Sequence, residues 1–536
     1  MVRLLKSKLI RRMLLVSLLM IVPWLVCVAI YKSGKPAGTI DYAAQFNQPI
    51  DAIAEDQRAW LVYRDVWTKY KLCSGSNDFM PNLYVGGEDG HSLVSPKDPE
   101  WEIATRFLES HHDLLTSLRT GGKLEALGLP LHSAPFNYSM EDRKALFPDE
   151  APDDPAFFAD PRDSPAYPGE EMLMGYFGPH IGSLRQAVRL LDIDTNWAID
   201  QHDFQRAVDN VVAIFGIARQ IGEHGSFIHG FTGAALQGVG IWVTSELLTE
   251  ATAQLSEAQL DQIQQAVAAC DVSKMFEFRG ERLYLLDLLQ HSYTDNGNGD
   301  GRITEQGMEY LKSLEVMLNG NKPSLIERMR GGILAAPQAL WFTASRKEAL
   351  KDLEEWSIRA SDYLPLPFWK KPDFESFLEE RKAASKRNPI VAHYFPQLEA
   401  TYHIQERCLA NRDGMLAAIA AIRFHKKNGV WPDSPNQLLG TYLTVEPLDR
   451  FNGQPLKFTI VDDEFRIYSI GPDGDDDIGR SILQSENGKF PKSNEPMDEF
   501  VKLNGVRNMP AIDFGFHLES HNEGDWILWP RNTEIE

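Results

Sequence analysis

A long apolar segment near the N-terminus is the feature that most limits what this chain can fold into. Met13 to Tyr31 has no charged residue over nineteen positions, and five basic residues precede it: Arg3, Lys6, Lys8, Arg11 and Arg12. As a helix, with about 1.5 Å of rise per residue, the segment would span a hydrocarbon core of about 30 Å. Basic residues favour the cytoplasmic side. We therefore expect a single transmembrane helix that leaves the N-terminus in the cytoplasm and the bulk of the chain in the periplasm or another extracytoplasmic space.

A cleaved signal peptide is the main alternative for this segment. Signal peptides share the basic start, but their apolar run is usually shorter and ends in small residues. Here the run ends in Ile30 and Tyr31. A lipoprotein signal could use Cys27, but the bulky Leu25 and Val26 precede it. The sequence therefore favours a retained signal-anchor.

The length of 536 residues exceeds what one hydrophobic core normally serves, so we expect more than one domain. We divide the chain into a basic start with its anchor (1–35), a helical extracytoplasmic domain (36–395) and a C-terminal domain with its tail (396–536). The formal net charge is −22, and every charge within 1–35 is basic, so the remaining chain is more acidic still. Such a surface repels nucleic acid, which we exclude as a partner.

The cysteines outside the anchor are too few for a disulfide framework. They are Cys73, Cys270 and Cys408, with large separations and no Cys-x-x-Cys spacing. One bridge is possible, but zinc or redox chemistry based on cysteine is not indicated.

Apolar residues three or four positions apart predict a mainly α-helical fold. The expected helices are 51–70, 99–118, 182–191, 202–221, 231–249, 256–269, 280–292, 303–318, 324–334, 346–360 and 398–427. Six prolines among many acidic residues make 147–170 a surface loop. No fixed repeat period is present, so we expect an irregular multi-helix domain, not a solenoid.

The stretch 295–306 lies between two expected helices and resembles an EF-hand calcium loop. In that register Asn296, Asn298 and Asp300 would supply side-chain oxygens and Arg302 its carbonyl, while Ile303 would hold the loop to the core. The twelfth position is Gly307, where an EF-hand has a bidentate Glu. The alternative is a glycine-rich turn capped by Asn and Asp side chains, and the sequence does not choose between this turn and a weak ion site.

Three motifs in order follow the helix expected at 398–427. They are Gly429-Val430-Trp431-Pro432, then Leu448-Asp449-Arg450-Phe451, then Tyr468-Ser469-Ile470-Gly471-Pro472-Asp473-Gly474. Between the last two, 456–460 and 465–470 alternate apolar and polar residues around a short polar turn, which predicts an antiparallel hairpin. This region resembles the head domain of type II secretion major pseudopilins, which implies a small α+β domain.

The same resemblance implies a calcium-binding loop after the last strand. Asp473, Asp475, Asp476 and Asp477 would be its ligands. The alternative is a solvated acidic turn without an ion. In a pseudopilin the membrane stem continues directly into the head helix, whereas here the apolar segment lies far upstream and the head helix contains Glu406 and Arg412. Assembly into a pilus is therefore not expected.

The common catalytic motifs are missing from the sequence. It has no nucleophile elbow, no His-Glu-x-x-His, no phosphate-binding loop and no dinucleotide-binding glycine motif. Two histidine groups remain, His111-His112-Asp113 and the pair His224 and His229 in a glycine-rich helix junction. We interpret the first as surface residues and the second as part of a turn.

Together these features favour a non-enzymatic, membrane-tethered scaffolding or binding protein with an envelope protein as its partner. The whole chain also resembles uncharacterised membrane-anchored envelope proteins of the planctomycete type, which implies no activity. One alternative is a secretion-system component that uses the pseudopilin-like head. Another is a hydrolase-like enzyme whose catalytic groups are scattered among the helices.

Overall fold

A computed structural model of the chain describes most of the helical region and parts of the C-terminal region. The described residues are 8–73, 84–87, 90–93, 95–132, 138–149, 172–173, 178–309, 343–370, 374–384, 387–388, 390–391, 395–396, 398–461, 463–471, 474, 476–479, 483–485, 506–508 and 525–530. The helices expected at 303–318 and 324–334 lie largely or wholly outside these residues, as does most of the acidic loop 147–170.

Helices dominate the described chain, which confirms that the fold is mainly α. They are α1 (Lys8–Ser33), α2 (Tyr42–Asp51), α3 (Ala59–Tyr70), α4 (Trp101–Ser110), α5 (His112–Gly122), α6 (Met140–Leu146), α7 (Pro179–Asp200), α8 (Phe204–Gly222), α9 (Phe227–Ala251), α10 (Glu257–Ala269), α11 (Arg279–Ser292), α15 (Arg346–Tyr363), α16 (Phe374–Ala384) and α18 (Leu398–Asn428). The strands are β1 (Tyr84–Gly87), β2 (Gly90–Leu93), β3 (Lys457–Val461), β4 (Glu464–Ser469), β5 (Leu483–Ser485), β6 (Val506–Asn508) and β7 (Trp526–Trp529).

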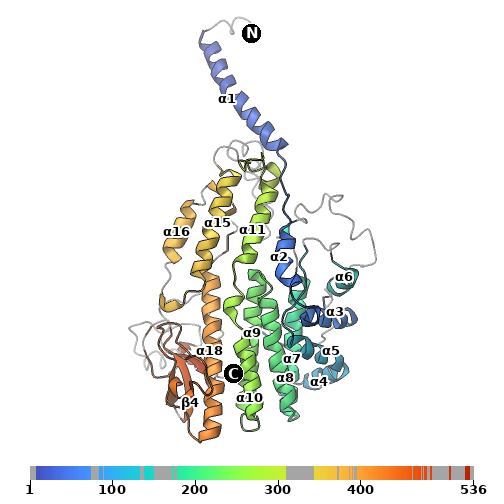
Figure 1. Cartoon of the computed structure of the whole chain (residues 1–536), viewed down its shortest axis with the longest axis vertical. Coiled ribbons are helices and arrows are strands. Elements are labelled where there is room, and N and C mark those ends of the chain that lie inside the picture. The colour runs from blue at the N-terminus through green and yellow to red at the C-terminus, as the bar shows by residue number, and fades with distance from the viewer. Residues whose placement is uncertain are drawn as a thin grey trace.

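Helix α8 lies at the centre of the helical region. It packs against α9, α7, α10 and α5, and Figure 1 shows the long helices running side by side along the body. Nearly all its apolar side chains are buried, from Val208 to Ile221. Two glycines allow the backbones of α8 and α5 to come into contact. A Cβ at Gly216 of α8 would lie 1.7 Å from the carbonyl oxygen of Gly122 in α5. The two backbones can meet there only if both positions lack a side chain.

The prediction of one helix at 99–118 is wrong, because the chain forms two helices there. Helix α4 ends at Ser110 and α5 begins at His112, with His111 between them at φ −117° and ψ 32°. The break lets both helices turn an apolar face to the core: Leu108 on α4 and Leu114, Leu115 and Leu118 on α5 are buried. A continuous helix would carry one stripe in one direction.

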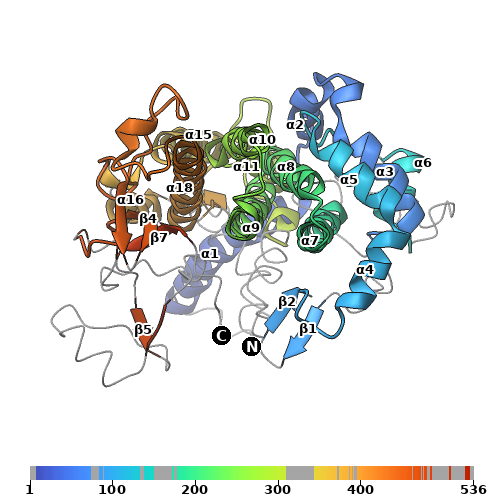
Figure 2. The same ribbon diagram turned by 90° about the horizontal axis from the view of Figure 1, so that it is seen from below.

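The predicted hairpin is present and gains a third strand. Strand β3 pairs antiparallel with β4, and β4 pairs antiparallel with β7 from the end of the chain. The sheet packs against α18, and Trp431 after that helix stacks on Phe465 of β4 with ring centroids 4.5 Å apart. Figure 2 shows this sheet on one side of α18 and the layer of α10, α8, α9 and α7 on the other.

Helix α1 contains the apolar segment 13–31 and projects from one end of the body in Figure 1. Within the part of the chain that the structure describes, no helix combines the length and the apolar character needed to cross a membrane. The expected transmembrane segment is therefore not supported by the described helices.

Candidate metal centre

Three histidines from three parts of the helical region meet in the core. His180 lies in the first turn of α7, His224 in the connection between α8 and α9, and His229 in the first turn of α9. Their exposed fractions are 0%, 6% and 0%. Among the described residues they form the one group of three or more His, Cys, Asp or Glu side chains that could hold a metal ion, with one potential ligand atom from each lying within 4.8 Å of the others.

The local sequence explains why α7 and α9 begin where they do and so place these histidines. Pro179 occupies the first turn of α7, where its missing N–H costs nothing and its fixed φ favours the helix. The connection to α9 turns at Gly225, whose φ of +104° disfavours other residues. Ser226 then precedes α9 in an extended conformation. His224 and His229 are thus placed on either side of one tight turn.

The rings are arranged around a common point. The Nε2 atoms of His180 and His229 are 3.1 Å apart, and these two rings are stacked. The ring of His224 stands nearly perpendicular to both, at 80° and 82°. The Nε2 atom of His224 is buried and has no hydrogen-bond partner within the protein. A buried polar atom without a partner is costly, so this nitrogen indicates a ligand that the protein itself does not supply.

A hydrogen bond to Ser226 orients the ring of His229. The Oγ atom of Ser226 lies 2.6 Å from Nδ1 of His229. When Nδ1 is the donor in this bond, Nε2 of His229 carries the lone pair and accepts the hydrogen bond from Nε2 of His180. A metal ion would take the place of that hydrogen. Such hydrogen bonds behind a ligand commonly fix its tautomer in metal sites.

Helix α11 supports the turn from behind. A Cβ at Gly280 would lie 1.5 Å from the carbonyl oxygen of Gly225, so the two backbones touch. The neighbouring Glu281 accepts the N–H of Phe227 at 2.7 Å and so satisfies a free N–H at the start of α9. Burial raises the pKa of Glu281 to about 7, against the lowering effect of that hydrogen bond.

Burial keeps all three imidazoles neutral. It lowers the pKa of His224 to about 4, and it lowers the pKa of His180 and His229 well below the usual value, with a smaller contribution from the neighbouring histidines. Neutral imidazole is the form that binds a metal ion. Burial therefore disfavours the imidazolium form that would compete with the metal, and the one remaining Nε2 proton lies in the hydrogen bond between His180 and His229.

The distances between the histidine nitrogens suit a three-histidine metal site if the third nitrogen moves slightly closer to the other two. With metal–nitrogen bonds of about 2.0–2.1 Å, tetrahedral ligand atoms are about 3.3 Å apart. The His180 and His229 nitrogens already have this spacing, and the third ligand atom lies within 4.8 Å. Three protein ligands leave a fourth position for water or another molecule, as in catalytic zinc sites.

The predicted calcium loop at 295–306 forms a turn closed by its own hydrogen bonds. The Oδ1 of Asn296 accepts the N–H groups of Asn298 and Asp300, at 2.9 and 3.2 Å. The carbonyl of Arg302, predicted as a ligand, accepts the N–H of Thr294 at 2.9 Å. These contacts are compatible with both the capped turn and an ion site, and the expected burial of Ile303, at 1% exposure, is confirmed.

Part of the second predicted calcium loop lies within the described residues. Asp473 and Asp475 lie outside the described residues. The carboxylate of Asp476 binds the ammonium group of Lys457 and accepts the hydroxyl of Tyr468 at 3.0 Å. Neither Asp476 nor Asp477 belongs to a described group of three metal-binding side chains. Calcium binding at either loop stays a prediction.

The sequence drew attention to two of the three histidines, but it placed them in a simple turn. His180 was missed because it lies 49 positions from His229 and its neighbours, Gly178 and Pro179, indicate only a helix start. The other group, His111-His112-Asp113, does not form one site: His111 contacts the carbonyl of Phe107, while Asp113 binds Lys69 and Tyr70.

The chain matches no known family model, no curated protein and no solved structure. What characterises the protein is therefore its architecture: a helical bundle with a buried three-histidine cluster and a small sheet at its C-terminal end.

Proposed function

We propose that this protein binds a divalent transition metal ion through His180, His224 and His229. The observation that carries the proposal is the unpartnered, buried Nε2 of His224 beside two other neutral imidazoles. An all-nitrogen, uncharged ligand set suits zinc, copper, nickel or ferrous iron and does not suit calcium, which requires oxygen ligands.

Metal analysis of the purified chain tests this proposal directly. We expect about one equivalent of metal per chain, removable by a chelator and restored by Zn²⁺. Substitution by Co²⁺ should give the intense visible absorption of a four-coordinate site. His180→Ala, His224→Ala and His229→Ala should each weaken metal binding by about 100-fold or more.

His112→Ala is the matched control, because His112 is exposed and belongs to no metal-binding group. This variant should bind metal like the unchanged chain. If the unchanged chain neither contains nor takes up metal, the histidines form a polar network of the core and the proposal is wrong.

We also propose that α1 attaches the protein to a membrane. The support is a set of long apolar side chains at 48–65% exposure on this one helix: Leu15, Leu18, Leu19, Ile21, Val22, Leu25, Val26 and Ile30. A helix with so much exposed apolar surface needs an apolar environment or a partner. In alkaline carbonate extraction the full chain should stay in the membrane pellet, and its release into the supernatant would contradict the attachment.

A further inference from the structure

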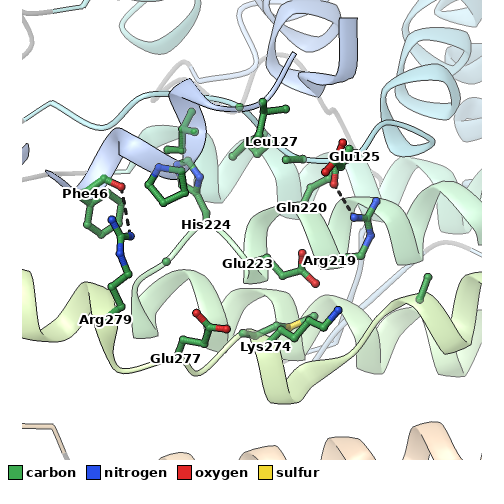
Figure 3. Close-up of a pocket in the computed structure, with 18 residues that line it drawn as sticks. Phe46, Glu125, Leu127, Arg219, Gln220, Glu223, His224, Lys274, Glu277 and Arg279 are labelled. Carbon is green, nitrogen blue, oxygen red and sulfur yellow. Dashed lines mark hydrogen bonds between the residues drawn. The ribbon is translucent and has the colours of Figure 1, made fainter. Parts of the chain in front are cut away.

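A pocket of about 560 Å³ lies directly beside the three-histidine cluster. It is formed by α2, the end of α8, the connection to α9 and the segment 274–279. His224 lines this pocket and also belongs to the histidine cluster. The pocket is therefore next to the proposed metal position, and Figure 3 shows its lining.

The pocket combines an apolar wall with charges of both signs. Its apolar side chains include Phe46, Ile50, Ile53, Leu127 and Met275. Six charged residues also line it, three basic and three acidic: Arg219, Lys274 and Arg279, and Glu125, Glu223 and Glu277. An aliphatic chain could lie on the wall while charged groups at its ends meet the charged residues.

The six charges form no close ion pair with one another, although Glu223 lies within the field of Arg219 and Lys274, and Arg279 within that of Glu277. Among the described residues, no ion pair within 4.0 Å involves any of them. The guanidinium of Arg219 donates to the carbonyls of Leu124 and Glu125, at 2.9 and 2.5 Å. These carbonyls fix the position of the guanidinium but carry no net charge, so its positive charge acts on the anionic groups that face the pocket.

Arg279 is fixed in the same way. Its guanidinium donates to the carbonyls of Phe46 and Gln45. In Figure 3 the carboxylate of Glu223 lies between the side chains of Arg219 and Lys274, and Glu277 lies further along the pocket. Burial is the largest influence on Glu223 and raises its pKa, although Arg219 and Lys274 act in the opposite direction.

We infer that this pocket binds a small zwitterionic molecule of the amino-acid class, with an aliphatic chain between a carboxylate and an ammonium group. The carboxylate faces Arg219 and Lys274, and the ammonium faces Glu277. A molecule with one charge only would match half of this lining and meet charges of its own sign in the other half, so it binds more weakly. This ligand site goes beyond the metal centre and does not require the metal to be bound.

Calorimetric titration of the full chain, after treatment with a chelator, tests the inference. The probe is 6-aminohexanoate, and the matched controls are hexanoate and hexylamine, which each lack one charge. We expect 6-aminohexanoate to bind at least about tenfold more tightly than either control. Because the protein is metal-free, a failure of the proposed metal centre leaves this result unaffected.

Two substitutions test the two ends of the ligand separately. Lys274 and Glu277 are both exposed and line the pocket, so we expect the fold to tolerate a neutral residue at either position. Lys274→Gln should weaken 6-aminohexanoate about tenfold and leave hexylamine unchanged. Glu277→Gln should weaken 6-aminohexanoate similarly and leave hexanoate unchanged. Lys123→Gln, which removes an exposed charge outside the pocket, should alter none of the three affinities.

Three results would overturn the inference. The first is equal affinity for 6-aminohexanoate, hexanoate and hexylamine. The second is no binding of 6-aminohexanoate at about 10 mM. The third is tight binding that Lys274→Gln and Glu277→Gln leave unchanged. Circular dichroism of each variant shows that a lost affinity reflects the pocket and not unfolding.

Discussion

At the scale of single residues, the metal centre depends on burial. An exposed histidine takes up a proton as the pH falls below about 6.5, whereas burial lowers the pKa of all three centre histidines, for His224 to about 4. A proton and a metal ion compete for the same lone pair. The environment that excludes the proton therefore keeps the site ready for metal.

Metal affinity should change little between pH 7 and pH 5. The folded imidazoles are neutral throughout this range, so the number of protons that the metal displaces does not change with pH. Competition titrations with a Zn²⁺ indicator, corrected for the indicator's own protonation, measure the affinity at pH 7, 6 and 5. An affinity that falls tenfold or more across this range would contradict the buried, neutral site.

The stability of the metal-free chain, unlike its metal affinity, should depend on pH. The unfolded histidines bind protons below about pH 6.5, while the folded ones, with depressed pKa values, do not. Protons therefore favour the unfolded state, and the stability contributed by the neutral cluster is lost as the pH falls below about 6.5. Chemical denaturation at pH 7 and pH 5 should show a smaller dependence in His224→Gln than in the unchanged chain.

The hydroxyl of Ser226 should matter for metal binding through His229. Ser226→Ala removes the partner of Nδ1, so the ring loses the bond that fixes its tautomer and orientation. We expect metal affinity to fall by about 10- to 100-fold, as for other groups behind a metal ligand. Ser226→Thr, which keeps the hydroxyl, should restore most of the affinity. If Ser226→Ala binds metal as tightly as the unchanged chain, the hydrogen bond does not orient the ligand.

At the scale of helices and turns, close backbone contacts position the site. The turn that carries His224 rests against the start of α11, where Gly280 meets Gly225. Helix α11 thus determines where the turn lies, although no histidine of the cluster comes from it.

Gly280→Ala should therefore destabilise the fold and disturb the metal centre. Its Cβ would lie 1.5 Å from the carbonyl oxygen of Gly225, so the turn or the helix has to move. We expect a loss of about 1–3 kcal/mol in the free energy of unfolding together with weaker metal binding. Denaturant unfolding and metal titration measure the two effects.

Gly238→Ala in α9 is the matched control. A Cβ at Gly238 has no neighbour within 4 Å, and alanine favours the helix interior. This variant should be more stable by about 0.5–1 kcal/mol and should bind metal normally. A Gly280→Ala variant that behaves like Gly238→Ala would show that the turn tolerates displacement.

The elements themselves could be predicted where one local pattern determines them. Helical spacing predicted most of α8, α9, α10, α11, α15 and α18, and alternation predicted β3 and β4. The break at His111 could not be predicted, because it follows from two different packing directions. Strand β7 was also missed, since Trp526 to Trp529 pairs with β4, which lies far away in the sequence. The histidine cluster has the same origin: only the packing of α7 on α9 brings His180 to His229.

At the scale of the whole molecule, α18 connects the helical region with the C-terminal sheet. It packs against α9 and α10 on one side and against β4 and β7 on the other. Arg423 on α18 also binds Glu257 and Asp261 of α10. The domain boundary expected near 395 therefore separates two parts that share this helix, and we expect them to unfold in one transition.

A buried ion pair tests this coupling. Glu406 of α18 is fully buried and binds Arg450, which belongs to the segment before β3. Arg450→Gln leaves a carboxylate in the core without its cation, so we expect a loss of about 3–5 kcal/mol. Because α18 is shared, this loss should shift far-ultraviolet circular dichroism and tryptophan fluorescence transitions together. Separate shifts would mean that the sheet region unfolds independently.

The pH dependence of this effect distinguishes a lost charge pair from a general packing defect. Burial raises the pKa of Glu406 even beside Arg450, and removal of the arginine would raise it further. In the folded variant the carboxyl would then stay protonated above its unfolded pKa, so stability falls as the pH rises through this range. The penalty of Arg450→Gln should thus be larger at pH 8 than at pH 5.

Arg466→Gln is the control. The partner of Arg466, Glu464, is half-exposed, so this variant should cost less than about 1 kcal/mol at either pH. An equal penalty for Arg450→Gln at both pH values would mean that Glu406 is held by packing and not by its charge.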